Sequence, residues 1–399
     1  MRFLHTSDWH LGRSLHRADL RAAQAAFLDH LVETARAERV DAVLVSGDVY
    51  DRAIPPLDAV AACEDALVRL RATGARVILI SGNHDSQRRL GFSSALIDAA
   101  GVHLRTRPHE LATPVLLDDN HGPVAVYGLP YLEPAVGLPP PPEGTTSDPW
   151  GLPPTGPGPV TPRSHQAVLG EGLARIRADA SSRGLSRVVV LAHAWVTGTE
   201  RSTLSDSERD IRVGGVGDVP ASLFDGLSYV ALGHLHGPQL VTDRVRYSGS
   251  PLPYSFSEAA HVKGSWLVEL AGDGQLAAEH VPAPVYRRLT ALRGDLKDLL
   301  TSPAHERHEA DFVAVTLTDP VRPQAAMDRL RARFPHVLTL EFKPEGVTAS
   351  GQSYGERIRG KDDLGVAAEF ISHVRNAGPT DGERELLRAA FAAATGSEE

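Results

Sequence analysis

The chain has little that would place it in an oxidising compartment or in a membrane. Its 399 residues include one cysteine, Cys63, so no disulfide can form within the chain. No apolar run approaches the roughly 20 residues of a membrane-spanning helix, and the first residues carry no apolar segment of the signal-peptide type. We therefore expect a cytoplasmic protein that has no membrane partner.

An excess of positive charge is also missing. The 41 Lys and Arg residues stand against 50 Asp and Glu residues, which leaves a formal net charge of -9. A protein that coats DNA through its overall field is usually basic, so this balance argues against such a role, and any phosphate binding has to be local. The length is enough for two or three domains of about 100 to 200 residues each.

Short β-branched runs alternate with longer alanine-rich stretches of helical periodicity. This pattern is typical of an α/β fold, in which helices connect parallel strands. We expect strands at residues 2–6, 42–46, 77–81, 124–127, 187–191 and 229–232, and helices at 18–38, 57–73 and 165–182. Residues 239–247 and 265–270 look like an antiparallel addition, because no helix-length connection separates them.

Two changes in composition indicate the domain limits. Residues 134–162 are rich in proline and glycine and almost free of apolar periodicity, so we expect a surface insertion within the first domain. After residue 284 a shorter strand–helix–strand–helix–strand pattern indicates a small α/β domain. We predict a first domain over 1–284, a second over 285–346, and a linker with a helical tail over 347–399.

Polar residues follow five of the expected strands. In chain order they are Asp8 with His10, Asp48, Asn83 with His84 and Asp85, His193, and His234 with His236. Open α/β sheets place their ligand site at the carboxyl ends of the strands, so we expect these side chains to converge.

This set combines carboxylate and amide oxygens with imidazole nitrogens. Such donors suit a pair of divalent ions such as manganese, iron or zinc better than calcium. Asp8 and His10 can bind one ion together, because they lie two residues apart on one side of an extended segment, and Asp48 can bridge two ions. Each short pattern alone is common at turns without a metal, but five of them in order, each at a strand end, favour a metal site.

The motifs resemble a known family. GD at 47–48, GNHD at 82–85 and GHLH at 233–236 are similar to those of the calcineurin-like metallophosphoesterases, and the resemblance extends over about residues 1–285. Residues 6–12 (TSDWHLG) and 247–258 (YSGSPLPYSFSE) further resemble the SbcD family, the nuclease subunits of bacterial SbcCD DNA-repair complexes. The resemblance implies a metallophosphoesterase sandwich with a small C-terminal α/β capping domain and a helical tail.

The resemblance also implies a role for each residue of the metal site. One ion would be held by Asp8, His10, Asp48 and His236, and the other by Asp48, Asn83, His193 and His234. Manganese is the expected metal, with magnesium, iron or zinc as alternatives. The nucleophile would be a water molecule activated by the ions.

His84 and Asp85 are the predicted catalytic residues. The resemblance implies that His84 orients the scissile phosphate or protonates the leaving oxygen, a task that suits an imidazole side chain. Asp85 would either orient His84 or fix its loop. Arg13, Arg52 and Arg88 lie close to the motifs in sequence and could contact DNA phosphates, although solvated helix faces explain arginines of this kind equally well.

The C-terminal third resembles the SbcD capping domain in length and order of elements. Beyond residue 363, two expected helices carry apolar residues at helical spacing, which favours docking onto a partner helix; folding back onto the capping domain is the alternative. In the SbcD family this tail binds the ATPase subunit. The implied partners are therefore an SbcC-type ATPase, DNA, and a second copy of the chain within a heterotetramer.

The sequence thus predicts a manganese-dependent DNA nuclease, acting as an exonuclease on double-strand ends and as an endonuclease on single strands and hairpins. Its place would be the cytoplasm, at the nucleoid during DNA repair and recombination. The alternatives are a phosphoesterase for small molecules or phosphoproteins, and a non-catalytic scaffold of the same fold. The usual mark of such a scaffold, lost ligands, is absent from the motifs.

Overall fold

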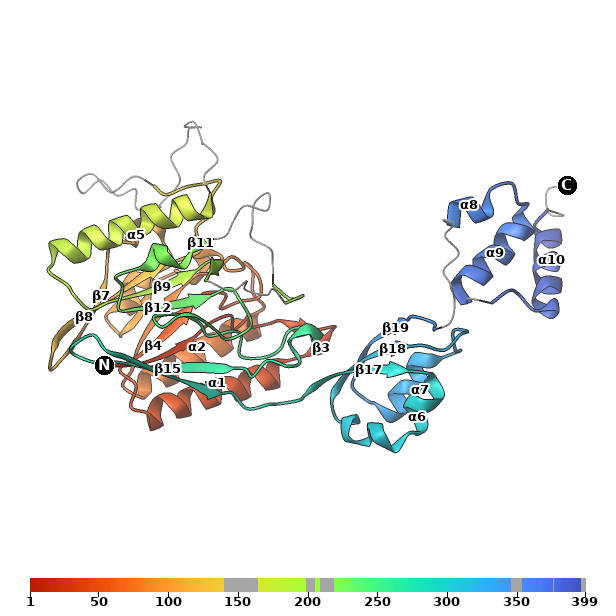
Figure 1. Cartoon of the computed structure of the whole chain (residues 1–399), viewed down its shortest axis with the longest axis horizontal. Helices are drawn as coiled ribbons and strands as arrows, with labels where there is room; N and C mark the ends of the chain where they lie inside the picture. Colours follow the sequence, from red (N-terminus) through yellow and green to blue (C-terminus); the bar gives the residue numbers. More distant parts are fainter. Residues whose placement is uncertain (140–163, 199–204, 209–218, 346–353, 376, 396–399) are drawn as a thin grey trace. The chain divides into compact units, whose positions relative to one another are not determined.

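The computed structural model describes residues 1–139, 164–198, 205–208, 219–345, 354–375 and 377–395. The chain divides into two compact units between Tyr286 and Arg287 (Figure 1). The predicted end of the first domain, residue 284, lies just before this point. From residue 140 onward the predicted insertion lies outside the described residues. The further division of the second unit into a capping domain and a tail stays a prediction.

Six strands form the first sheet, in the order β16-β15-β1-β4-β5-β6. The parallel strands are β1 (Arg2–Thr6), β4 (Ala42–Ser46), β5 (Arg76–Ile80) and β6 (Val102–Leu104), and the antiparallel edge is formed by β15 (Gly264–Leu270) and β16 (Leu276–Pro282). All residues of β4 are buried. Its uninterrupted apolar sequence follows from this burial, because a parallel strand covered on both faces need not alternate.

The second sheet has six strands in the order β13-β14-β12-β9-β8-β7. The parallel strands are β8 (Gly122–Leu129), β9 (Val188–His193), β12 (Tyr229–Gly233) and β14 (Val245–Tyr247), and the antiparallel edges are β7 (Val115–Asp119) and β13 (Gln239–Thr242). The predicted antiparallel pairing is confirmed, since β13 pairs antiparallel with β14 and β15 pairs antiparallel with β1. The two segments do not form one addition, however: β14 pairs parallel with β12 in this sheet, and β15 belongs to the other sheet. Tertiary packing, which a local pattern does not contain, selects these partners.

The two sheets pack face to face between helices. Apolar side chains of both sheets form the inner core, with Phe3, Leu44 and Ile78 on one side and Val126, Leu191 and Ala231 on the other. Helices α1 (Arg21–Ala37) and α2 (Leu57–Ala72) cover the outer face of the first sheet, and α5 (His165–Ser182) covers that of the second (Figure 1). This arrangement confirms the predicted α/β sandwich.

The helices of the first unit follow the apolar periodicity of the sequence. In α1 the buried residues Phe27, Leu28, Leu31 and Val32 recur at spacings of three and four, which places them on one face. The predicted helix at 18–38 begins later than expected, because a short hairpin of β2 (Ser14–Leu15) and β3 (Ala18–Asp19) precedes it. The remaining short elements are α3 (Gln87–Leu90), α4 (Ser94–Asp98), β10 (Val196–Thr197) and β11 (Val219–Pro220).

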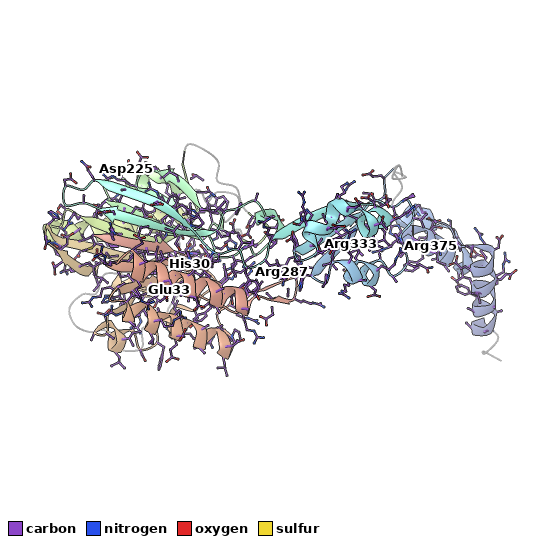
Figure 2. The ribbon with its side chains drawn as sticks, turned by 90° about the horizontal axis from the view of Figure 1, so that it is seen from below. His30, Glu33, Asp225, Arg287, Arg333 and Arg375 are labelled. Carbon is purple, nitrogen blue, oxygen red and sulfur yellow. The ribbon has the colours of Figure 1, made fainter. Side chains whose placement is uncertain are left out.

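The second unit contains a smaller parallel sheet in the order β17-β18-β19. Its strands are β17 (Leu289–Gly294), β18 (Phe312–Leu317) and β19 (Val337–Phe342), connected by α6 (Leu296–Thr301) and α7 (Ala326–Arg333). Arg333, labelled in Figure 2, donates to the carbonyl oxygens of Leu299 and Ser302 at 3.0 and 2.8 Å, and so joins the end of α7 to the end of α6.

Three further helices follow: α8 (Tyr354–Ile358), α9 (Asp363–Arg375) and α10 (Asp381–Thr395). Arg375, also labelled in Figure 2, links α9 to α10 through two contacts with Glu383 at 2.6 and 2.8 Å. None of the described residues of α9 is buried. Throughout the described ranges, no helix has both the length and the apolar character needed to cross a bilayer.

Candidate metal centre

The ends of five strands supply the side chains of one buried polar cluster. It comprises Asp8 and His10 after β1, Asp48 after β4, Asn83 after β5, His193 at the end of β9, and His234 and His236 after the end of β12. Apart from the half-buried Asn83, each of these residues is at most 2 % exposed. The structure thus brings together the seven predicted ligands from two different sheets, and their role as ligands stays a prediction.

Asp48 occupies the middle of the cluster. Its Oδ2 lies 3.7 Å from Nε2 of His10 and 3.5 Å from Nε2 of His193. One carboxylate therefore faces an imidazole of each predicted ion site. This is the position that a bridging carboxylate between two cations requires.

The remaining contacts form two groups. On one side, Nε2 of His10 faces Nε2 of His236 at 3.1 Å, and Asp8 offers a ligand atom within 4.8 Å of both. On the other side, Oδ1 of Asn83 lies 2.9 Å from Nε2 of His193 and 3.2 Å from Nδ1 of His234. Asp8 also forms a group of potential ligand atoms with Asp48 and His193, a contact that the sequence did not suggest.

Four of the predicted ligands have a left-handed backbone. The φ angles are 52° for Asp8, 44° for His10, 48° for Asp48 and 108° for His234. Residues other than glycine seldom adopt such angles, and those that do cluster at functional sites. The loops after β1 and β4 hold each other in this form, because the amides of Asp8 and His10 donate to the carbonyl oxygens of Gly47 and Asp48 at 3.0 and 2.9 Å.

Glycines let the backbone approach the ligands closely. A Cβ atom at Gly82 would lie 2.1 Å from Oδ1 of Asp48, and one at Gly47, whose φ is +90°, would lie 2.5 Å from Nδ1 of His193. No side chain fits at either position without displacing a predicted ligand. The glycines of the GD and GNHD motifs are therefore explained by contact with the centre.

The two carboxylates differ in their electrostatic surroundings. Burial raises the pKa of Asp8 to about 7, although His193 acts in the opposite direction. Burial would also raise the pKa of Asp48, but the charge of His193 and its hydrogen bond to Asp48 outweigh burial and hold this pKa well below its usual range. The central carboxylate is thus the one that stays ionised.

Most imidazoles of the centre are held in the neutral form. Burial lowers the pKa of His236 to about 4 and takes the pKa values of His10 and His234 well below the usual range. Burial acts likewise on His193, but Asp48 and Asp8 raise its pKa to about 9. Neutral imidazole is the form that binds a metal, so a cation at His193 has to displace a proton.

The donor set fits divalent cations. Nε2 of His10 and Nε2 of His236 face each other at 3.1 Å, so two nitrogens that can each offer a lone pair to a cation converge there. Two carboxylates, an amide oxygen and four imidazoles match the mixed oxygen and nitrogen donors of manganese, iron or zinc sites.

His84 and Asp85 have separate tasks in the structure. His84 donates its backbone amide to Oδ1 of Asp48 at 2.8 Å, and its Nδ1 lies 2.8 Å from the carbonyl oxygen of Asp51. Asp85 accepts hydrogen bonds from the amides of Gly82, Val49 and Tyr50 at 3.0, 3.1 and 2.9 Å. These contacts favour the loop-fixing alternative for Asp85, since a backbone carbonyl orients the His84 ring.

The three predicted phosphate contacts differ in position. Arg13 lies beside the centre, where it donates to the carbonyl oxygen of Ser207 at 2.8 Å and packs over the ring of Tyr254 at 5.0 Å. Arg52 and Arg88 lie outside this position, Arg52 exposed in the loop after β4 and Arg88 in α3. Binding of DNA phosphate by any of the three stays a prediction.

Sequence reasoning missed a polar layer behind His236. Ser207, Glu258 and Lys263 are buried or partly buried there, and Oε1 of Glu258 lies 3.5 Å from Nδ1 of His236. Burial would raise the pKa of Glu258, but His236 and Lys263 together hold it well below its usual range. The motif at 247–258, which ends in Glu258, was the signal available in the sequence. The structure shows that Glu258 is fully buried, which is unusual for a glutamate.

Comparisons with known proteins identify two families. Residues 1–136 match the calcineurin-like phosphoesterase family, and residues 285–375 match a domain model named SbcD_C and described as the type 5 capsule protein repressor C-terminal domain. A solved structure from Thermus thermophilus is 14% identical, with 70% of this chain and 98% of that chain covered and a TM-score of 0.39. A dimetal phosphatase from Danio rerio is 18% identical, with 71% and 96% covered and a TM-score of 0.41.

Proposed function

Because this chain joins a calcineurin-like phosphoesterase domain to an SbcD-type C-terminal domain, we propose that it is a metal-dependent DNA nuclease. It would cut double-stranded DNA from its ends and single strands or hairpins internally, in DNA repair and recombination. Its place would be the cytoplasm, at the nucleoid. Phosphoester hydrolysis is the activity that the match of residues 1–136 to the calcineurin-like phosphoesterase family supports.

One observation carries the catalytic part of the proposal. Oδ2 of Asp48 lies 3.7 Å from Nε2 of His10 and 3.5 Å from Nε2 of His193, and all three residues are at most 2 % exposed. Bound there, two divalent cations would supply positive charge that stabilises the phosphorane-like transition state and makes water more acidic. We propose manganese as the metal, with magnesium, iron or zinc as alternatives.

His84 is the residue placed to handle the substrate. It is 9 % exposed, which makes it the most accessible histidine of the centre, and its ring packs edge-on against His10 with 4.7 Å between centroids. The carbonyl oxygen of Asp51 only accepts, so Nδ1 of His84 carries a proton. Nε2 is then the nitrogen left for the substrate: it accepts a hydrogen bond in the neutral ring, and it donates to a phosphate oxygen or to the departing sugar oxygen when the ring carries a second proton.

The preference for DNA over small phosphates rests on the second unit. The SbcD-type match covers residues 285–375, and we propose that this part of the chain contacts DNA and limits which substrate reaches the centre. The net charge of -9 means that attraction of the DNA backbone has to come from the cations and from nearby arginines such as Arg13.

We propose an SbcC-type ATPase as the partner of helices α9 and α10. Phe370 and Val374 on α9 are 56% and 43% exposed, and Leu386 on α10 is 71% exposed. Apolar side chains at helical spacing that remain exposed are suited to packing against a partner helix. A chain lacking residues 354–399 should keep metal binding and lose capture of the ATPase in a pull-down assay.

We also propose that the chain pairs with a second copy of itself. Ile54, just before α2, and Leu57 and Val60, in its first turn, are 67%, 87% and 39% exposed, an apolar group that a second copy could cover. Leu57→Glu should convert a dimer into a monomer in analytical ultracentrifugation. An unchanged sedimentation coefficient would assign the pairing surface elsewhere.

The proposed function is tested with manganese and three substrates: end-labelled duplex DNA, a DNA hairpin and a generic phosphomonoester. We expect cleavage of both DNA forms and weak turnover of the monoester. His84→Ala should lower DNA cleavage roughly 100- to 10,000-fold, since it removes the group that exchanges a proton with the leaving oxygen. The bound manganese, measured by mass spectrometry of the metal, should stay the same.

His109→Ala is the matched control, because His109 is exposed and lies outside the centre. It should leave both activities unchanged. Fast hydrolysis of the monoester with intact DNA would favour a small-molecule phosphoesterase. Neither activity, with manganese bound, would favour a non-catalytic scaffold, and unchanged DNA cleavage by His84→Ala would reject the role of His84.

A further inference from the structure

We infer that Glu258 is a positioning residue: acting through Ser207, it fixes the tautomer and orientation of His236, so that Nε2 is the nitrogen offered to a cation. The inference rests on the metal centre of the proposed function and adds two residues behind it. It also assigns a role to Glu258, the last residue of the motif at 247–258.

The two ring nitrogens of His236 face different groups. Nε2 lies 3.1 Å from Nε2 of His10, on the side of the predicted ligands. Nδ1 lies 2.6 Å from Oγ of Ser207 and 3.5 Å from Oε1 of Glu258. His236 is 2 % exposed, so bulk water does not compete for either nitrogen.

Counting protons along these contacts assigns the tautomer. Oγ of Ser207 also contacts Oε1 of Glu258, and a hydroxyl has a single proton. An ionised carboxylate only accepts, so Ser207 donates its proton to Glu258 and accepts a hydrogen bond from Nδ1–H of His236. The neutral ring then has its lone pair on Nε2, the nitrogen that points toward the predicted ligands.

Lys263 supplies the counter-charge that keeps Glu258 ionised. Nζ of Lys263 lies 2.6 Å from Oε2 of Glu258, and the two side chains are 6% and 0% exposed. Nζ also donates to the carbonyl oxygen of His236 at 2.7 Å and to Oγ of Ser250 at 2.9 Å, which uses all three of its protons. The ion pair therefore holds both the backbone and the ring of His236.

Other residues of the motif brace the neighbouring loop. Oγ of Ser248 lies 2.8 Å from Oγ of Ser7, which donates to Oδ2 of Asp8 at 2.5 Å. The ring of Tyr254 packs edge-on against His10 with 5.4 Å between centroids. Residues 247–258 thus support the loop after β1 along their length and orient His236 at their end, as expected of groups behind a metal site.

Two variants of the full chain test the inference. Ser207→Ala removes the relay without leaving a buried charge unpaired, and Glu258→Gln keeps the shape of the side chain while removing its charge. We expect each to bind manganese about 10- to 100-fold more weakly in isothermal titration calorimetry, the usual effect of losing a group that orients a ligand. Glu279→Gln, at an exposed residue of β16, is the matched control and should bind as the unaltered chain does.

The tautomer is measured separately, in metal-free protein, from the nitrogen-15 shifts of labelled histidines. We expect the Nδ1–H form for His236 in the unaltered chain and a loss of this preference in both variants; His236→Gln identifies the signal. A merely structural role for Glu258 would not move this readout. If Glu258→Gln does not fold because Lys263 lacks its counter-charge, Ser207→Ala decides.

An Nε2–H tautomer of His236 in the unaltered chain would overturn the inference. So would unchanged manganese affinity in a folded Ser207→Ala variant. Failure of the proposed function would give a different result. His236 would still show the Nδ1–H form and lose it in Ser207→Ala, but the manganese-loaded chain would leave DNA intact.

Discussion

Aspartates follow parallel strands in both units of the chain, and the two units use them differently. In the first unit Asp8 and Asp48 come two residues after β1 and β4. In the second unit Asp295 follows β17 directly, and Asp319 comes two residues after β18. By position alone, either pair would suit a ligand site at the carboxyl ends of a parallel sheet.

The aspartates of the second unit serve the backbone. Oδ1 of Asp295 accepts a hydrogen bond from the amide of Asp298 at 2.8 Å, as the N-cap of α6. Oδ2 of Asp319 accepts one from the amide of Leu296 at 2.9 Å. Both carboxylates satisfy amides that the first turn of a helix leaves without a helical partner.

The first unit differs in its backbone and in what lies opposite its aspartates. Asp8 and Asp48 adopt left-handed angles, and histidines from the second sheet face them. An aspartate at a strand end is therefore a weak metal signal by itself. What distinguishes a site is a second set of donors on a facing sheet and a loop that turns the carboxylate toward it.

The largest contrast should come from neutralising one aspartate in each unit. Asp48→Asn removes the charge that faces both His10 and His193, so we expect DNA cleavage to fall about 1,000-fold or more and manganese binding to weaken strongly. Asp319→Asn keeps an oxygen that can accept from Leu296 and should leave cleavage unchanged. Initial rates and metal content of the two full-length variants check this.

Equal losses in the two variants would mean that the second unit takes part in the chemistry. An active Asp48→Asn variant with its metal retained would remove the bridging role from Asp48. Either result would contradict the conclusion that the aspartates of the first unit act in the metal centre and those of the second unit only satisfy backbone amides.

A smaller contrast is expected from adding a methyl group to one glycine in each unit. At Gly82 a Cβ atom would lie 2.1 Å from Oδ1 of Asp48, whereas at Gly294 the nearest atoms, in Leu299, are 3.6 Å away. We expect Gly82→Ala to lower the free energy of unfolding by about 1–3 kcal/mol and to weaken manganese binding, because overpacking displaces Asp48. Gly294→Ala should stay within about 0.5 kcal/mol of the unaltered chain in urea denaturation.

Much of the fold could be predicted because it follows from local patterns. The fully buried run of β4 and the helical spacing in α1 are visible in the sequence, and the observed bounds lie within a few residues of those expected. Residues 239–247 and 265–270 pair antiparallel as predicted, but their separation into two sheets was not predicted, since strand pairing depends on contacts across the whole chain. The family resemblance, made on short motifs, is confirmed by the two domain matches.

The sequence predicted which residues come together in the candidate site, but it did not predict the backbone angles and hydrogen bonds that hold them there. Residues such as Asp48 and His193 follow expected strands and belong to residue types that bind metals, so the sequence indicated that their side chains lie close together. The left-handed angle at Asp48 and the three amides on Asp85 are results of loop packing that no spacing rule contains. The layer behind His236 brings Glu258 to His236 and to Ser207, which are 22 and 51 positions away in the chain.

A third contrast concerns helix caps rather than ligands. Asp295→Ala should lower the stability of α6 by about 1 kcal/mol, because the amide of Asp298 loses its partner. In hydrogen exchange of the full chain, α6 should then exchange roughly 5-fold faster. Manganese binding should not change, and a fall in it would show that Asp295 acts on more than its helix.

The smallest expected effect separates two ion pairs, one in each unit. Arg187 holds Asp119, at the end of β7, with two hydrogen bonds of 2.8 and 2.6 Å. In the second unit Arg293 and Glu345 make a 2.9 Å contact between side chains that are 54% and 65% exposed. The hydrogen bonds from Arg187 hold the pKa of Asp119 well below its usual range.

The sign of the pH effect follows from that lowered pKa. A carboxyl group that is more acidic in the folded chain adds stability above its unfolded pKa, about 3.9, and this stability is lost as the pH falls through the lower, folded value. At pH 7 we expect Asp119→Asn to lower the free energy of unfolding by about 1 kcal/mol or less, because water screens a carboxylate that is 20% exposed. Urea denaturation should show this difference shrinking below about pH 4, whereas Glu345→Gln should have little effect at any pH, since a single contact between exposed side chains is worth little. A difference for Asp119→Asn that persists unchanged in acid would mean that packing around Arg187, and not the charge of Asp119, stabilises this edge of the sheet.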